Sequence, residues 1–237
     1  MLYEFLLIYV ETFTFLNVFK YITFRTGLAF FTSLFIALII GGPFIKLFSN
    51  KKIFNPIRED GPSDHIVKKI GTPTMGGIII LIGIIFSVIL WADLSNLYIL
   101  FCLYIVSSFG LLGAFDDYKK IRDTSSKGIS SRLKILIQLF LAVLGLIVLT
   151  YFVEYDEFNN LYFPFFKNLF VNLSWFFVPF SVFVIVGSSN AVNLTDGLDG
   201  LATVPVILVA GCFAFISYVT GNIVFSNYLQ ILYIEGA

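Results

Sequence analysis

Long apolar segments separated by short polar connections dominate the chain. A membrane-spanning helix needs roughly 20 mainly apolar residues, and six segments qualify, at about 27–48, 75–92, 97–115, 133–153, 173–189 and 201–220. A helix is one of the few structures that satisfies its own backbone polar groups within hydrocarbon. We therefore expect an all-α fold, a polytopic integral membrane helical bundle that forms a single membrane domain over residues 1–237.

Residues 1–24 follow a weaker pattern. Glu4, Glu11 and Lys20 interrupt the apolar residues, and no basic region precedes the first apolar run. We therefore expect an interfacial helix here rather than a full crossing, and no cleaved signal peptide.

Composition agrees with a membrane protein. Hydrophobic residues make up 58% of the chain and charged residues 13%, whereas soluble domains are about half apolar and a quarter charged. Because the formal net charge is zero, an overall basic surface for nucleic acid is not indicated. Cys102 and Cys212 lie in apolar runs without a second Cys or His at metal-ligand spacing, so we interpret them as core residues.

The charged residues are distributed unevenly among the connections. Eleven of the fifteen Lys and Arg residues lie in two loops, namely Lys51, Lys52, Arg58, Lys68 and Lys69 in the first and Lys119, Lys120, Arg122, Lys127, Arg132 and Lys134 in the second. The connections around Asp93 and residues 154–167 are acidic or nearly uncharged. The positive-inside rule places the two basic loops in the cytoplasm. The N-terminus and residues 221–237 are then outside, and the loop at 190–200 is cytoplasmic.

The span at 97–115 runs directly into a pair of carboxylates. Asp116 and Asp117 are followed by Lys119 and Lys120. Adjacent carboxylates at a span end repel each other, and a divalent metal, a phosphate ligand bridged by one, or the nearby lysines would relieve that repulsion. Mg²⁺ is the expected metal, because it binds carboxylates together with substrate phosphates. A solvated span boundary with Asp and Lys as interface anchors explains the pattern equally well.

A second polar cluster follows the fifth span. Asn190, Asn193, Asp196 and Asp199 recur at every third position, so they share one face for as long as the backbone stays helical. Amide and carboxylate groups on one face suit a nucleotide and a hydrated metal. The alternative is an Asx-rich turn between two helices. We favour a ligand site, since a turn does not require four such residues in register with a span.

A third cluster precedes the second span and contains Lys68, Lys69 and Thr74. Threonine hydroxyls suit the cap of the helix that follows, and a helix N-terminus beside two lysines suits an anion. Basic anchors before a capped helix are an equally good explanation. We interpret His65, the one histidine of the chain, as a loop residue.

These strings closely resemble the phospho-N-acetylmuramoyl-pentapeptide-transferase family, part of the polyprenyl-phosphate hexose-1-phosphate transferase superfamily. The matching strings are Tyr21-Ile-Thr-Phe-Arg25, Arg58 to His65, Gly71 to Gly77, Phe115-Asp-Asp-Tyr118, Pro164-Phe-Phe-Lys167 and Asn190 to Ala202. The last string is highly specific, whereas the paired Asp motif fits the whole superfamily. The resemblance runs the length of the chain.

The resemblance implies a ten-span α-helical enzyme, commonly a homodimer, in the bacterial cytoplasmic (inner) membrane. Such an enzyme transfers phospho-MurNAc-pentapeptide from UDP-MurNAc-pentapeptide to undecaprenyl phosphate, a membrane lipid, and releases UMP. It requires Mg²⁺ and makes the first lipid-linked precursor (lipid I) of peptidoglycan biosynthesis.

The resemblance also assigns roles to residues. It implies that Asp116 and Asp117 are the catalytic carboxylates and Mg²⁺ ligands. Asp116 is the candidate for deprotonating the lipid phosphate, and a covalent role for a carboxylate is the alternative. The implied substrate-binding residues are Lys69, Thr74, Lys120, Asn190, Asn193, Asp196 and Asp199.

The chain departs from the family in its later part. The family has a third essential Asp, a metal ligand, and a His-rich loop after it, whereas no Asp follows Asp199 and the one histidine is His65. We therefore expect a C-terminally truncated portion, with six of ten spans, that does not complete the Mg²⁺ site by itself.

Other classes of protein remain open. A transporter or channel also places acids and amides at helix ends, but it usually needs ionisable groups deep within spans, and these spans contain almost none. An inactive truncated remnant would keep the motifs without releasing UMP. Among enzymes, the runner-up is a related UDP-N-acetylglucosamine polyprenyl-phosphate transferase, which the longer matches to the muramoyl branch disfavour.

Overall fold

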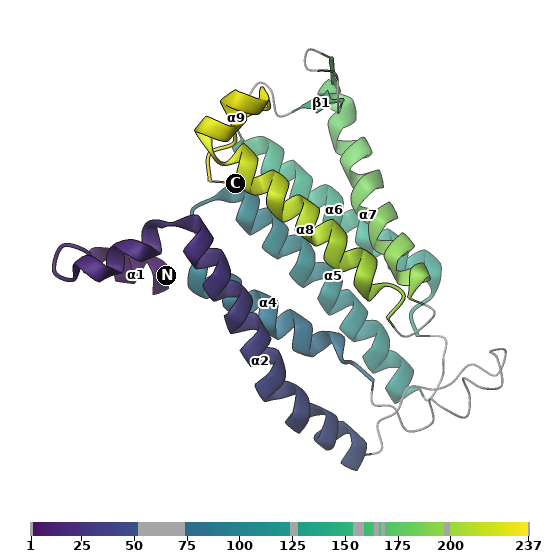
Figure 1. The fold of residues 1–237 in the computed structure, drawn as a ribbon. Coiled ribbons are helices and arrows are strands. Elements are labelled where there is room, and N and C mark those ends of the chain that lie inside the picture. The colour runs from purple at the N-terminus through teal and green to yellow at the C-terminus, as the bar shows by residue number, and fades with distance from the viewer. Residues whose placement is uncertain are drawn as a thin grey trace. The chain divides into compact units, whose positions relative to one another are not determined.

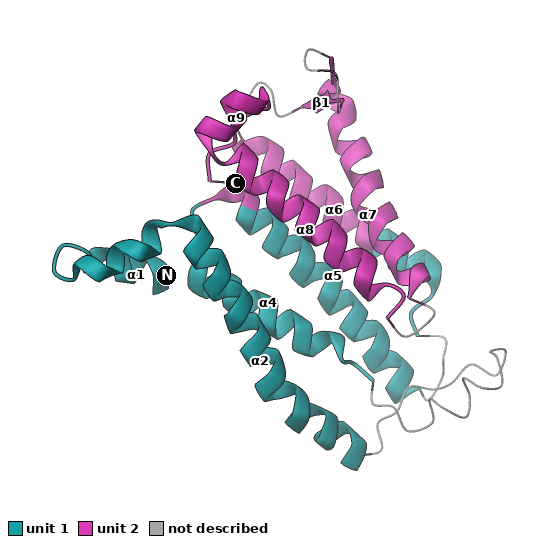
Figure 2. Cartoon of the chain, in the orientation of Figure 1, with its two compact units in different colours: residues 1–95, 99–137 teal, residues 96–98, 138–237 magenta. Residues whose placement is uncertain are grey.

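The computed structural model of the chain describes residues 2–51, 74–123, 128–153, 159–163, 166, 169–196 and 200–236. These residues are mostly helical, with one two-stranded hairpin (Figure 1). The predicted all-α helical bundle is therefore confirmed. The chain divides into two compact units, residues 1–95 with 99–137 and residues 96–98 with 138–237 (Figure 2). The expectation of a single domain stays a prediction.

The first unit contains the N-terminal helices. They are α1 (Leu2–Ile8), the 3-10 helix η1 (Thr14–Lys20), α2 (Ile22–Asn50), α4 (Gly77–Trp91), most of α5 (Leu97–Arg122) and the first residues of α6 (Ser131–Phe152). Because α1 and η1 have 7 residues each, the start of the chain does not form a spanning helix, as predicted. Its location at the membrane interface stays a prediction.

Helices α2 and α4 are in close contact within this unit. The indole Nε1 of Trp91 donates a hydrogen bond of 2.9 Å to Thr32 Oγ1, and the Trp91 ring stacks on Phe19, with ring centroids 5.8 Å apart. A Cβ at Gly83 would lie 3.2 Å from the Ser33 carbonyl oxygen. Glycine at position 83 therefore allows the two backbones to approach each other.

A short turn joins α4 to α5. Asp93 Oδ1 accepts hydrogen bonds from the hydroxyl of Ser95 at 2.6 Å and from its backbone N–H at 3.0 Å. The Ser95 hydroxyl, followed by the backbone bond, holds the pKa of Asp93 below its usual value, although partial burial opposes this effect. The carboxylate therefore stabilises the turn in its ionised form.

The second unit contains the remaining elements. They are the rest of α6, the strands β1 (Asn160–Tyr162) and β2 (Phe170–Asn172), the 3-10 helix η2 (Ser174–Phe176), α7 (Phe177–Thr195), α8 (Thr203–Thr220) and α9 (Ile223–Leu229). The strands pair antiparallel, with Leu161 opposite Val171. Asn222 caps α9 by accepting hydrogen bonds from the backbone N–H groups of Val224 and Phe225.

Five helical segments of the described residues are long and apolar enough to cross a membrane. They are Ile22–Asn50, Leu97–Arg122, Ser131–Phe152, Ser174–Thr195 and Thr203–Thr220. The remaining predicted span, at about 75–92, corresponds to α4, which is apolar but has only 15 residues. Such a helix is about 22 Å long, shorter than the roughly 30 Å hydrocarbon core. Five of the six predicted spans therefore correspond to helices long enough to cross a membrane.

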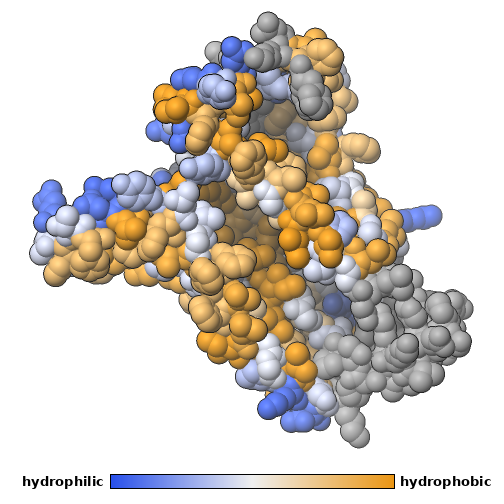
Figure 3. Space-filling view, viewed as in Figure 1, coloured by the Kyte–Doolittle hydropathy of each residue, from blue (hydrophilic) through white to orange (hydrophobic). Residues whose placement is uncertain are grey.

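Apolar side chains cover much of the helical surface (Figure 3). In α8 the one buried residue is Val219, whereas Ile207, Phe213 and Phe215 are each more than 60% exposed. Water would make so much exposed apolar surface unfavourable, but lipid tails would not. Together with the spans, this surface indicates a multi-pass membrane protein.

Candidate functional site

The paired carboxylates that the sequence singled out, Asp116 and Asp117, lie near the end of α5. Asp116 comes one helical turn after Leu112, and both residues are buried, because positions four apart share a helix face. Asp117 points about 100° further round the helix. Its side chain is 35% exposed, compared with 11% for Asp116. The two carboxylates therefore differ in their access to solvent and ligands.

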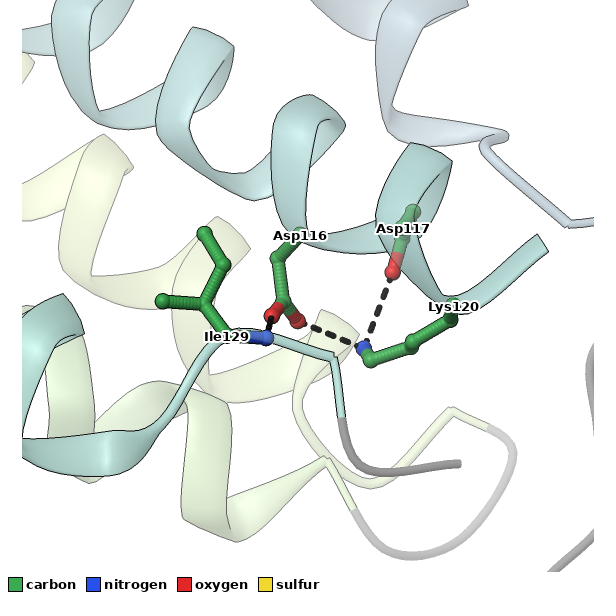
Figure 4. A network of polar contacts seen from close by, with 4 residues as sticks. All are labelled: Asp116, Asp117, Lys120 and Ile129. Atoms are coloured by element: carbon green, nitrogen blue, oxygen red, sulfur yellow. Dashed lines mark hydrogen bonds and ion pairs between the residues drawn. The ribbon is translucent and has the colours of Figure 1, made fainter. Parts of the chain in front are cut away.

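Lys120 joins the two carboxylates. It lies four residues after Asp116 and three after Asp117, the two spacings at which side chains meet on a helix. Lys120 Nζ is 2.6 Å from Asp116 Oδ2 and 3.0 Å from Asp117 Oδ1 (Figure 4). The ammonium group thus neutralises part of the repulsion between the two adjacent acids.

A backbone N–H from the chain after α5 fixes the buried carboxylate. Ile129 N–H donates a hydrogen bond of 2.7 Å to Asp116 Oδ1 (Figure 4). Gly128 precedes it with a φ of 55°, and a Cβ at this position would overlap Asp116 Oδ1 and lie 2.8 Å from Lys120 Cε. Both oxygens of Asp116 are therefore held by donors, and the tight approach requires glycine at position 128.

The carboxylate pair fits a magnesium ion by the chemistry of its donors. No group of three or more His, Cys, Asp or Glu that could hold a metal occurs among the residues that the structure describes. Mg²⁺ is commonly bound by one or two carboxylates together with substrate phosphates and water. Asp116 and Asp117 supply such a pair of carboxylates. Both already bind a cationic group, the Lys120 ammonium.

The second predicted cluster begins inside α7. Val182 and Val186 are buried on one face of this helix, and Asn190 continues that face one turn later. Asn190 Nδ2 donates to the Val186 carbonyl oxygen at 2.8 Å and to Gln138 Oε1 at 2.8 Å. Asn190 is therefore tied to a side chain of α6 as well as to its own helix.

The remaining members of this cluster lie at the end of α7. Asn193 is helical and exposed, α7 ends at Thr195, and the exposed Asp196 follows directly. Among the described members of the cluster, Asn190 and Asn193 are therefore helical and Asp196 lies just past the helix end. Asp199 lies outside the described residues.

The structure describes only part of the third predicted cluster. Thr74 is buried, at 8% exposure, and lies just before α4. The N-cap residue of α4 is Gly76, without a side-chain capping hydrogen bond, so Thr74, the described threonine of this cluster, does not cap the helix. Lys69 lies outside the described residues.

Three residues of these clusters were not identified from the sequence. Gly128 carried a signal, since an isolated glycine in a polar loop often marks a positive φ. Gln138 also carried one, as an amide within an apolar span. Ile129 contributes only its backbone N–H, and no side-chain pattern reveals such a contact.

Comparison with known proteins assigns a family to most of the chain. Residues 97–236 match the sequence model of glycosyl transferase family 4. This range includes Asp116, Asp117 and Lys120 together with the described cluster of α7.

Several curated relatives are similar along the chain, and each is named phospho-N-acetylmuramoyl-pentapeptide-transferase. The protein of Pelagibacter ubique (strain HTCC1062) is 66% identical over 236 residues, which are 100% of this chain and 65% of the relative. That of Bartonella quintana (strain Toulouse) is 49% identical over 223 residues, 93% of this chain and 61% of the relative. That of Rickettsia bellii (strain RML369-C) is 47% identical over 235 residues, 99% and 64% respectively. The chain thus spans less than two thirds of the length of these relatives.

Substitution of Gly128 tests the packing around Asp116. We expect Gly128→Ala to lower the free energy of unfolding by about 1–3 kcal/mol, because a side chain at positive φ is strained and the added Cβ overlaps the carboxylate. Hydrogen exchange at the Ile129 amide should become faster. Gly76→Ala is the matched control, since a Cβ at Gly76 meets nothing within 4 Å. Equal effects of the two substitutions would show that Gly128 does not position Asp116.

Proposed function

Because this chain belongs to glycosyl transferase family 4, we propose that it is the N-terminal portion of a phospho-N-acetylmuramoyl-pentapeptide-transferase. The full protein transfers phospho-MurNAc-pentapeptide from UDP-MurNAc-pentapeptide to undecaprenyl phosphate and releases UMP. The names of the relatives support this substrate assignment. The observation that carries the proposal is the pair of carboxylates that shares one lysine at the end of a membrane-spanning helix.

Phosphoryl transfer depends mainly on positioning and on neutralising charge. In the proposed reaction, an oxygen of undecaprenyl phosphate attacks the phosphorus attached to the sugar. A new phosphorus–oxygen bond forms, the bond from that phosphorus to the UMP oxygen breaks, and UMP leaves with the bonding electron pair. The products are UMP and an undecaprenyl-diphospho-sugar.

Asp116 is the proposed base in this reaction. Its Oδ1 stays on the Ile129 N–H, whereas its Oδ2 is paired with Lys120. When a phosphate arrives, the Lys120 ammonium turns to a phosphate oxygen, because charge-assisted hydrogen bonds to phosphate are strong. Asp116 Oδ2 is then available to take the proton of the acceptor phosphate, while Ile129 keeps the carboxylate in place.

Mg²⁺ is the proposed cofactor. Asp116 and Asp117 would hold it, with Asp117 the more accessible of the two carboxylates. The ion would supply further neutralisation of the diphosphate charge.

We assign nucleotide and diphosphate binding to the remaining predicted residues. They are Lys69, Thr74, Asn190, Asn193, Asp196 and Asp199. The exposure of Asn193 and Asp196 at the end of α7 supports their access to a ligand. Lys120 neutralises phosphate charge. The homodimer implied by the family resemblance stays a prediction.

The proposed sidedness follows from the charged loops. With the basic loops in the cytoplasm, the end of α5 lies at the cytoplasmic surface of the membrane. Both the soluble nucleotide and the membrane-embedded acceptor can reach it at this surface. The N-terminus is then on the outer side of the inner membrane.

Release of UMP tests the proposed function. The protein would carry this chain joined to the C-terminal part of the Pelagibacter ubique relative, and the assay would supply UDP-MurNAc-pentapeptide, undecaprenyl phosphate and Mg²⁺. We expect UMP release that requires Mg²⁺ and falls by about 10²–10⁴-fold in Asp116→Asn, because a general base is lost. Asp123→Asn is the matched control, since this exposed carboxylate pairs only with Arg122 among the described contacts.

Two outcomes would count against this function. A folded joined protein that releases no UMP would indicate an inactive remnant or another substrate. Full activity of Asp116→Asn would show that Asp116 is not the base.

Labelling of single cysteines tests the sidedness. In a Cys102→Ser, Cys212→Ser background, we expect Ser95→Cys to react with a membrane-impermeant maleimide in cells with a permeabilised outer membrane. Lys51→Cys should react only after the inner membrane is opened, because its loop is cytoplasmic. Both positions are exposed, so solvent access alone does not separate them. The reverse labelling pattern would invert the proposed orientation.

A further inference from the structure

Gln138 is a buried amide within a membrane-spanning helix. Its exposure is 3%, and it lies seven residues after the start of α6 at Ser131, about 10 Å along the helix. An amide removed from water is unfavourable unless it makes hydrogen bonds. Its partner therefore indicates why an amide is present at a position that suits an apolar residue.

The partner of Gln138 is Asn190, in which both amide hydrogens are engaged. Asn190 Nδ2 donates to Gln138 Oε1 and to the Val186 carbonyl oxygen, each at 2.8 Å. The Val186 carbonyl can only accept a hydrogen bond, so the atom of Asn190 that faces it is the nitrogen. This fixes the orientation of the Asn190 amide and, in turn, identifies the Gln138 atom that faces it as the oxygen.

Within the part of the chain that the structure describes, one hydrogen-bonding group of the Asn190 side chain is left for a ligand. Its two N–H donors are used within the protein, and Oδ1 can only accept. A phosphate oxygen, which also only accepts, is therefore not a partner for Asn190. An N–H or O–H donor of a nucleotide base or sugar can instead donate a hydrogen bond to Asn190 Oδ1.

The position of the contact along α7 supports a role in ligand binding. Val182 and Val186 form the buried part of the helix face, and Asn190 is where this face becomes polar before the exposed Asn193 and Asp196. Gln138 contacts α7 at this boundary. A merely structural amide pair could lie at any depth in the two helices.

We infer that Gln138 is a positioning residue, which holds the Asn190 amide so that its Oδ1 accepts a hydrogen bond from an N–H or O–H group of the nucleotide-sugar substrate. The inference rests on the proposed function for the identity of that substrate. It assigns Gln138 a role through Asn190 and no contact of its own with the ligand.

Steady-state kinetics of the joined protein test the role of Gln138. We expect Gln138→Leu to raise the KM for UDP-MurNAc-pentapeptide about tenfold with kcat little changed, because Asn190, held then by the Val186 carbonyl alone, is less well oriented and binds the donor less well. Gln138→Glu retains an acceptor oxygen and should restore KM to within about threefold of the unsubstituted protein. In an Asn190→Ala background, Gln138→Leu should have no further effect, since coupled residues are not additive.

Thr150→Val is the control for loss of a polar group from α6. Among the described contacts, the Thr150 hydroxyl donates only to carbonyl oxygens of its own helix, those of Leu146 and Ile147, so its loss should leave KM unchanged. An unchanged KM in Gln138→Leu would overturn the inference. So would an equal rise in KM with and without Asn190, because Gln138 would then act by another route.

A second measurement separates this inference from the proposed function. In protein labelled with ¹⁵N-asparagine, we expect the side-chain amide hydrogens of Asn190 to exchange slowly, and to exchange faster in Gln138→Leu. Fast exchange in the unsubstituted protein would overturn the inference whether or not UMP is released. Slow exchange in a protein that releases no UMP would overturn the proposed function and the ligand assigned to Asn190. It would leave intact the conclusion that Gln138 holds the Asn190 amide.

Discussion

The interaction on which the candidate site depends is the sharing of the Lys120 ammonium between Asp116 and Asp117. Two adjacent carboxylates at the end of an apolar helix repel each other, and Asp116 is also largely removed from water. Breaking a buried ion pair is strongly destabilising, because it leaves an uncompensated charge. One lysine, placed at both favourable helical spacings, therefore allows the acids to remain where a phosphate could reach them.

The same carboxylate links α5 to the chain that leads into α6. The Ile129 N–H binds the oxygen that Lys120 does not, so Asp116 keeps one fixed contact when the lysine moves to a ligand. A fixed carboxylate next to a movable cation suits phosphoryl transfer, in which positioning and charge neutralisation do most of the chemistry. The hydrogen bond between Asn190 and Gln138 applies the same principle to a neutral group. Gln138 holds the nitrogen of the Asn190 amide so that its Oδ1 faces the ligand.

Local sequence predicted those features that depend on local spacing. Nearby lysines were one of three predicted ways to relieve the repulsion between Asp116 and Asp117, and Lys120 lies at the helical spacings that do so. Apolar runs predicted the long helices. Contacts between distant residues were not predictable, because Ile129 acts through its backbone and Gln138 reaches Asn190 over 52 positions of sequence. The start of α4 at Gly77 was not predictable either, because no local signal fixed it.

A crystal structure of the joined protein with Mn²⁺ in place of Mg²⁺ and with UDP-MurNAc-pentapeptide would test the central claim most directly, since manganese is located by its anomalous scattering. We predict an ion about 2.1 Å from a carboxylate oxygen of Asp116 or Asp117, close to the usual Mg²⁺ distance, with Lys120 turned to a phosphate oxygen. A manganese ion bound by neither carboxylate, with Lys120 still between the two acids and the diphosphate elsewhere, would contradict it.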